Sequence, residues 1–178
     1  MRKYLLNVIF VVAILFFSCS GGKTNDELTL SSEKLQTIIK EKPKTLLFFW
    51  TSWCGASHYV LENTYKQLAD SLEKQSIDAN IILLCASANQ DSIVKTLSQL
   101  FGIQSYYMEN PGSGMALLDR YHIKEFLTIN FGEHNQELIT KGNLQFGIPI
   151  SLIVNDENKL INSDPPQDVI YLIKLLTE

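Results

Sequence analysis

The sequence has 178 residues and a formal net charge of −4, with 15 lysine and arginine residues against 19 aspartate and glutamate residues. This length suits one domain with its own core. An acidic chain is a poor binder of polyphosphates, so the charge argues for no nucleic acid among the expected partners. With only three cysteines, the chain is not a disulfide-rich scaffold.

The first 18 residues predict an export signal. Arg2 and Lys3 precede an apolar run, residues 8–17, that ends at Ser18-Cys19. A run of 10 apolar residues is too short to cross about 30 Å of hydrocarbon as a helix. A charged start followed by a short apolar core and small residues is typical of a signal peptide. Its removal takes away two positive charges and leaves a net charge of −6.

The segment "FFSCS" resembles a bacterial lipoprotein box, in which a small residue precedes a cysteine that is lipidated and becomes the new N-terminus. Phe16 departs from that pattern, in which leucine is usual. The resemblance implies a lipid on Cys19 and anchoring to a membrane of the bacterial cell envelope. A plain signal peptide with an incidental cysteine and an uncleaved membrane anchor are the alternatives, and all three place the folded part outside the cytoplasm. The polar residues 19–26 predict a flexible tether.

Strands and helices are predicted to alternate over the remaining domain, residues 27–178, because short apolar runs alternate with segments of helical spacing. The predicted strands cover residues 28–30, 45–50, 80–88 and 105–108 and the two arms of a hairpin around residues 156–158. The predicted helices begin behind Ser31 or Ser32 and at or near Cys54, and cover residues 93–100, 115–123 and 167–176. This order predicts an α/β fold with a central mixed sheet flanked by helices on both faces.

The stretch "TSWCGASHYV" places Cys54 directly after a buried strand and at the start of the next helix. Unpaired backbone N–H groups and the helix dipole favour a negative charge at such a position. Under these conditions a thiol becomes a nucleophilic thiolate. Trp53 and Gly55 fit a tight, partly exposed turn between strand and helix. The pattern therefore predicts a reactive thiol at Cys54.

Two segments resemble the signatures of the thioredoxin-like superfamily. "FFWTSWCGAS" looks like the first signature, in which F-W-x-x-W-C-G-x-C runs from a strand into the active-site helix. "FGIPISLIVND" resembles the second, a cis-proline loop that opens the next strand and faces the active-site cysteine. The segments between them follow in the order seen in envelope-anchored TlpA/ResA-type members. The resemblance covers residues 28–176 and implies a thioredoxin-like fold.

This resemblance also implies the residues of the site. Cys54 takes the place of the attacking thiol, and Ser57 that of the resolving cysteine. Pro149 would be cis, and Ile148 would offer its backbone to an extended substrate segment by strand-like pairing. The substrate-binding residues implied are Trp53, Gly55, Ile148 and Pro149. No cofactor is implied.

Three departures from the family pattern bear on activity. A dithiol site attacks a disulfide and then releases the mixed disulfide with its second thiol. Ser57 cannot perform that second step, although its hydroxyl can donate a hydrogen bond to a Cys54 thiolate. Phe48 and Val60 stand where acidic residues usually handle protons. Residues 124–146 form an insertion before the proline loop, either a lid or recognition surface or a surface elaboration without contact to the site.

Four further residues are candidates for the site. Cys85 ends a predicted buried strand and is expected to be a buried, inert thiol. His58 either faces solvent on its helix, which we favour, or helps to hold a thiolate when protonated. His122 and His134 have no metal-ligand spacing with each other or with a cysteine, so no metal site is predicted.

Three functions are open from the sequence. The favoured one is a monothiol protein that captures a client protein or a small-molecule thiol as a mixed disulfide at Cys54. The second is a non-catalytic binding module that uses the groove at Ile148 and Pro149 to hold a partner. The third is a monothiol glutaredoxin with an iron-sulfur cluster, which C-G-x-S also resembles. The tryptophan context and the export signal argue against this third function.

Overall fold

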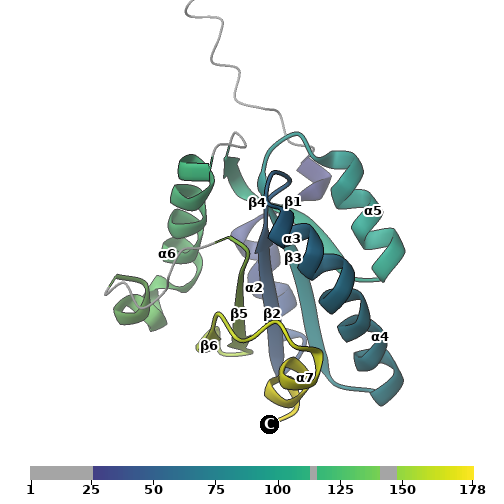
Figure 1. Cartoon of the computed structure of the whole chain (residues 1–178). Helices are drawn as coiled ribbons and strands as arrows, with labels where there is room; N and C mark the ends of the chain where they lie inside the picture. Colours follow the sequence, from purple (N-terminus) through teal and green to yellow (C-terminus); the bar gives the residue numbers. More distant parts are fainter. Residues whose placement is uncertain (1–25, 113–115, 141–147) are drawn as a thin grey trace, which may run out of the picture.

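The structure, a computed structural model, describes residues 26–112, 116–140 and 148–178. The predicted signal peptide, Cys19 and most of the predicted tether lie outside the described residues. The described chain forms a central sheet with helices packed against its two faces (Figure 1).

The sheet has six strands in the order β1-β4-β3-β2-β5-β6. Strands β1, β4, β3 and β2 run parallel to one another, whereas β5 is antiparallel to β2 and β6 is antiparallel to β5. The predicted mixed sheet is therefore confirmed. The strands are β1 (Thr29–Leu30), β2 (Lys44–Trp50), β3 (Ala79–Ser87), β4 (Gln104–Gly112), β5 (Ile150–Asn155) and β6 (Leu160–Ser163).

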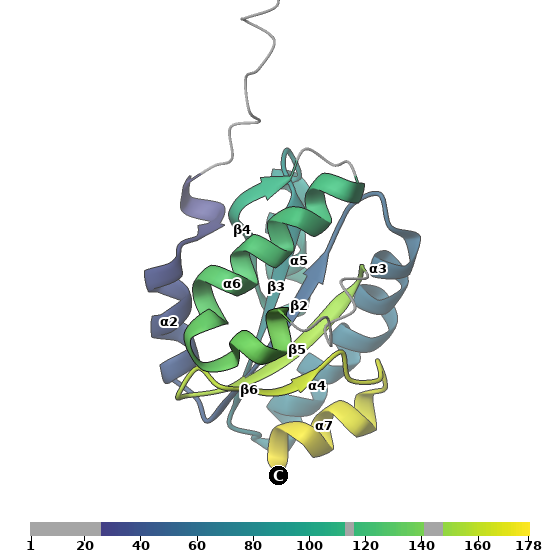
Figure 2. The same cartoon turned by 90° about the vertical axis from the view of Figure 1, so that its left-hand side faces the viewer.

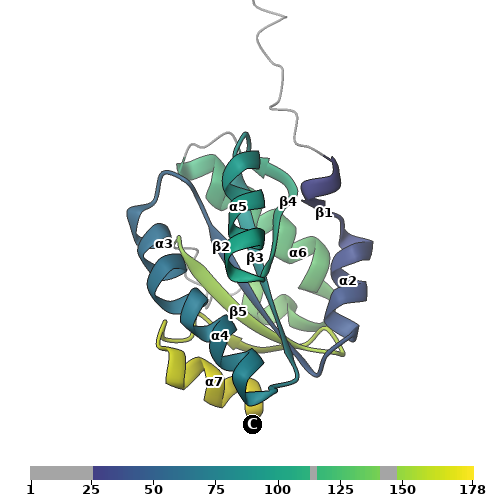
Figure 3. The same ribbon diagram turned by 90° about the vertical axis from the view of Figure 1, so that its right-hand side faces the viewer.

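Helices cover both faces of this sheet, as predicted. Helices α2 and α6 lie on one face (Figure 2), and α3, α4, α5 and α7 lie on the other (Figure 3). A π-helical turn, η2, joins α3 to α4, and a short 3-10 turn, η1 (Asp26–Leu28), precedes β1. The other elements are α2 (Ser32–Lys40), α3 (Gly55–Val60), η2 (Leu61–Tyr65), α4 (Lys66–Gln75), α5 (Asp91–Phe101), α6 (Ala116–Thr140) and α7 (Val169–Thr177).

The apolar side chains of the central strands divide between two cores, because successive residues of a strand point to opposite faces. In β2, Leu47 and Phe49 join the core under α2 and α6. Leu46, Phe48 and Trp50 join the core under the other four helices. A strand buried on both faces explains why β2 is a continuous apolar run with no polar alternation.

The helix ends follow the local signals in the sequence. Ser31 caps α2, since its side chain accepts a hydrogen bond from the Lys34 backbone N–H at 3.3 Å. Gly102 ends α5 with a φ of 61°, a left-handed conformation that glycine adopts without steric cost. Both predicted boundaries are confirmed.

Part of residues 124–146 belongs to the core, which neither sequence interpretation had included, whether the lid or recognition surface or the surface elaboration without contact to the site. As far as Thr140 this segment is helical and continues α6, and residues 141–147 lie outside the described residues. Phe126, Leu127 and Phe131 are buried in the core between α6 and the sheet. The helical part of the segment is therefore a layer of the fold, because burial of these side chains stabilises the whole domain.

A kink in α6 is joined to the β5–β6 turn by side-chain amides. Asn135 has a non-helical φ of −133°, and its Oδ1 accepts a hydrogen bond from the Leu160 backbone N–H at 2.9 Å. Asn158 Nδ2 donates to the Asn130 carbonyl at 2.7 Å. These hydrogen bonds hold the second half of α6 against the β5–β6 hairpin, so the kink belongs to the contact between α6 and the hairpin.

Candidate functional site

The sheet topology brings Cys54 and Pro149 to the same end of the sheet, where β2 finishes and β5 begins. Strand β2 ends at Trp50, and the next residues form the turn that carries Cys54. Strand β5 runs antiparallel to β2 and begins with Ile150 opposite Phe49. The residues before β5 therefore arrive where β2 ends, although they are almost 100 positions away in the sequence.

Cys54 is the N-cap residue of α3, as predicted. Its backbone is extended, with φ −95° and ψ 106°, and its carbonyl accepts hydrogen bonds from the N–H groups of Ser57 at 3.0 Å and His58 at 3.4 Å. The thiol is half-buried and donates to the Ile148 carbonyl, with the sulfur 3.4 Å from the oxygen. The Ile148–Pro149 peptide bond is cis, as expected. Cys54 and the proline loop are thus in contact.

Ser57 lies one helical turn beyond Cys54, but its hydroxyl forms no hydrogen bond with the Cys54 sulfur. The residue is fully buried, and its hydroxyl has no hydrogen-bond partner within the described ranges. An unsatisfied buried hydroxyl is costly, so Ser57 has a free donor for any acceptor that comes within reach. The hydrogen bond from the Ser57 hydroxyl to a Cys54 thiolate remains a prediction, since in this structure the Cys54 thiol donates its hydrogen bond to the Ile148 carbonyl.

The surface around Cys54 is partly apolar and open. Trp53 is 40% exposed and Tyr59 is 69% exposed, and Ile148 and Pro149 are half-buried beside the thiol. A Cβ added to Gly55 would meet no atom within 4 Å. The turn has room for a side chain at position 55 and does not itself require glycine there.

The half-buried ring of His58 is hydrogen-bonded to the turn before Cys54. The favoured interpretation of His58 as a solvent-facing helix residue was therefore wrong. Its Nε2 lies 3.0 Å from the Ser52 carbonyl. Because a carbonyl only accepts, Nε2 carries the proton. Its ring also packs edge-on against Trp50, with the ring centroids 6.2 Å apart. His58 therefore braces the turn from α3.

A neutral polar group lies beside Phe48, the position at which the sequence resemblance implied an acidic residue. The ring of Tyr65 packs on Phe48, with 4.3 Å between centroids, and its hydroxyl lies 2.9 Å from Ser151 Oγ. Gln167 Nε2 donates to the same Oγ at 2.8 Å. Burial raises the pKa of Tyr65 well above its usual value, so this hydroxyl stays protonated and takes no proton from a thiol.

The sequence analysis did not identify this polar group. The only local signal was Ser151, a polar residue inside the apolar strand β5. Such a residue indicates a buried hydrogen-bond partner, but the strand pairing that brings Tyr65 and Gln167 to it is not visible in a single segment.

The other residues considered in the sequence are Cys85, His122 and His134. Cys85 is buried, and its thiol donates to the Ser87 carbonyl at 3.2 Å, which confirms its expected burial. His122 Nδ1 lies 3.5 Å from Glu125 on the same helix. Among the described residues, no group of three or more histidine, cysteine, aspartate and glutamate side chains is arranged to hold a metal ion. The side chain of His134 lies outside the described part.

No protein-family model matches the sequence, and no curated protein matches it. Several solved structures are similar in fold. A thiol:disulfide interchange protein from Bacteroides sp. is 10% identical with a TM-score of 0.47, and the match covers 78% of this chain and 76% of that one. StoA from Bacillus subtilis is 16% identical with a TM-score of 0.45, over 78% and 84% of the two chains. The thioredoxin domain of a thiol-disulfide oxidoreductase from Bacteroides vulgatus is 10% identical with a TM-score of 0.49, over 78% and 82%.

The chain has a thioredoxin-like fold, as the sequence resemblance implied. Parallel strands β4, β3 and β2 are followed by antiparallel β5, with the Cys54 turn directly after β2 and the cis Pro149 directly before β5. The roles of Cys54, Ser57 and the proline loop stay predictions.

Proposed function

We propose that the protein is a thioredoxin-like lipoprotein of the cell envelope in which Cys54 acts as a single exchanging thiol. The observation that carries this proposal is the position of the Cys54 sulfur, 3.4 Å from the Ile148 carbonyl at the start of α3. Ser57 replaces a second thiol. The partner is a client protein or a small-molecule thiol in its disulfide form.

Capture at Cys54 is one thiol-disulfide exchange. The thiolate attacks one sulfur of the client disulfide, a new S–S bond forms, the client S–S bond breaks, and the other client sulfur leaves as a thiolate. Release needs an external thiol, which attacks the mixed disulfide and returns Cys54 as a thiolate. Each step forms one S–S bond and breaks one, so neither step requires an external oxidant.

The Ile148 carbonyl couples the state of the thiol to substrate binding. In the resting protein this oxygen accepts a hydrogen bond from the Cys54 thiol. A thiolate has no proton and cannot donate such a bond. Ionisation therefore leaves the Ile148 oxygen free to accept a hydrogen bond from the backbone N–H of a client segment. Strand-like pairing at this residue would hold the client disulfide beside the sulfur.

A single adduct at Cys54 is expected when the full chain is treated with oxidised glutathione. The chain would carry Cys19→Ser, so that Cys54 and Cys85 are its two thiols. Cys54 is half-buried on an open turn and Cys85 is buried, so one glutathione per chain should map to Cys54 by intact mass and peptide analysis.

The matched control for this experiment is Cys54→Ser, which should take up no glutathione. Modification of Cys85 instead, or of neither cysteine, would contradict the proposal. If no adduct forms and Cys54→Ser keeps its affinity for a client protein, the non-catalytic binding module is the better description.

The envelope location rests on Cys19 and the apolar run before it. The proposed organisation is a signal peptide over residues 1–18, a tether over 19–26 and the domain over 27–178. In the part of the chain that the structure describes, no helix is both long and apolar enough to cross a bilayer. In this proposal a lipid on Cys19 holds the domain at a membrane.

Loss of the lipid is expected in Cys19→Ser. Bacteria expressing the wild-type chain and given a fatty-acid analogue should label it and keep it in the membrane fraction. The Cys19→Ser chain should lose the label and shift to the soluble fraction, whereas Cys54→Ser should behave as wild type. Equal labelling of all three chains would rule out Cys19 as the lipidated residue.

A further inference from the structure

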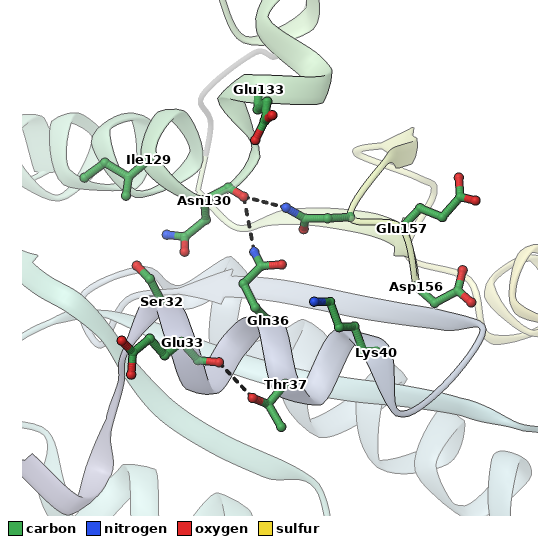
Figure 4. Close-up of a pocket in the computed structure, with 11 residues that line it drawn as sticks. Ser32, Glu33, Gln36, Thr37, Lys40, Ile129, Asn130, Glu133, Asp156 and Glu157 are labelled. Atoms are coloured by element: carbon green, nitrogen blue, oxygen red, sulfur yellow. Dashed lines mark hydrogen bonds between the residues drawn. The ribbon is translucent and has the colours of Figure 1, made fainter.

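An open polar cleft lies between α2, α6 and the β5–β6 turn (Figure 4). Its volume is about 710 Å³, within the range of small-ligand sites. The turn follows Asn155, which pairs with Lys44 at the start of β2, whereas Cys54 follows the other end of that strand. A strand of seven residues is roughly 20 Å long. The cleft is thus distinct from the thiol site.

Negative charge dominates the lining of the cleft. Four carboxylates from three elements line it, with Lys40 as the one cation among the lining residues, and the carboxylates belong to Glu33, Glu133, Asp156 and Glu157. Within residues 26–112, 116–140 and 148–178, none of the four forms an ion pair. The field in the cleft therefore attracts cations and repels anions.

Buried acceptors without partners add to this charge. Asn130 is 7% exposed, and its side chain extends from α6 toward α2 at the wall of the cleft (Figure 4). Its Nδ2 donates to the Phe126 carbonyl at 2.9 Å, but its Oδ1 has no partner among the described residues. Asn158 Oδ1 is also buried and unpartnered. Buried carbonyl oxygens are normally satisfied, so these two oxygens need a donor.

Two amide donors of the cleft are already used. Gln36 Nε2 and Asn158 Nδ2 both donate to the main-chain carbonyl of Asn130, at 3.3 and 2.7 Å (Figure 4). The cleft thus offers unpaired acceptors and negative charge together. A ligand that matches it carries several N–H donors and a positive charge.

We propose that this cleft binds an alkylammonium or guanidinium group, supplied by a free polyamine or by a lysine or arginine side chain of a partner peptide. The carboxylates of α6 and the β5–β6 turn supply the attraction. The Asn130 and Asn158 oxygens accept hydrogen bonds from the N–H groups. A metal ion is a poorer fit, because no three ligating side chains converge within the described segments.

Calorimetric titration of the full chain at low ionic strength tests this proposal with two probes. One probe is spermidine, and the other is a short peptide with a single arginine among neutral residues. Saturable binding of spermidine alone would identify a free polyamine as the source, and binding of the peptide alone would identify a side chain. Replacing Glu133→Gln together with Asp156→Asn should weaken binding by about tenfold, since two nearby charges are removed.

The matched control is Glu62→Gln together with Glu73→Gln, which removes two exposed carboxylates from η2 and α4. This control should leave the affinity within about twofold, because both residues belong to helices on the other face of the sheet. Asn130→Leu should also weaken binding if the variant folds, and the charge variants decide the question if it does not. Failure of both probes to saturate, or an equal loss in the two double variants, would overturn the proposal.

Discussion

Ser57→Cys is expected to shorten the lifetime of a mixed disulfide at Cys54 by about 10³-fold or more. Position 57 lies one helical turn after Cys54, with its backbone N–H 3.0 Å from the Cys54 carbonyl, so a thiol there attacks within the same molecule. Effective molarities of well-oriented intramolecular reactions reach about 10⁵ M or more, whereas an external thiol acts at its own millimolar concentration. The variant should therefore release the client and close a disulfide between positions 54 and 57.

The measurement is the decay of the glutathione adduct by mass spectrometry, in the same Cys19→Ser background. Ser57→Ala is the matched control, and its adduct should last far longer than that of Ser57→Cys because it adds no thiol. A Ser57→Cys adduct as durable as the wild-type one would show that position 57 does not reach the sulfur. A gain of insulin reduction in Ser57→Cys alone would locate the missing activity of the wild-type chain at the second exchange step.

The features that the sequence predicted best are those that depend on one segment. Residues 45–50 form a strand because a short apolar run with β-favouring residues has few alternatives. Cys54 becomes an N-cap because it follows that strand and precedes residues of helical spacing. The two thioredoxin signatures then supplied the pairing between the Cys54 turn and Pro149, a contact that no single segment contains.

The contacts of the site that the sequence missed involve main-chain atoms. The Cys54 thiol and the His58 ring both bond to carbonyl oxygens, those of Ile148 and Ser52. Every residue has a main-chain carbonyl oxygen, so the sequence does not indicate which of them accepts a hydrogen bond from a given side chain. The neutral pair of Tyr65 and Ser151 was missed for a related reason, since it depends on how a helix packs over a distant strand.

The helical nature of residues 124–140 was missed although its spacing is present. Ile123, Phe126, Leu127 and Phe131 recur at helical intervals and are all buried. Ile129, which is exposed, lies midway between Leu127 and Phe131 and gives the segment a strand-like alternation as well. Periodicity over so few residues does not separate the two patterns, and only packing against the sheet does.

Phe126→Ala is expected to lower the free energy of unfolding by about 3 to 5 kcal/mol, the usual cost of removing a buried phenylalanine ring. The Phe126 ring is 2% exposed and packs edge-on against Phe49 of β2, with 5.7 Å between centroids. If the segment were a surface elaboration, the same change would cost almost nothing. Urea unfolding followed by circular dichroism measures the difference.

The control for Phe126→Ala lies two residues further along the same helix. Thr128 is exposed, and its hydroxyl donates only to the Lys124 carbonyl of α6 at 2.8 Å. Thr128→Ala should therefore stay within about 0.5 kcal/mol of wild type, as surface substitutions usually do. Similar unfolding midpoints for both variants would mean that α6 does not contribute to the core. A large loss in Phe126→Ala alone would mean that the sheet depends on α6 for one of its two buried faces.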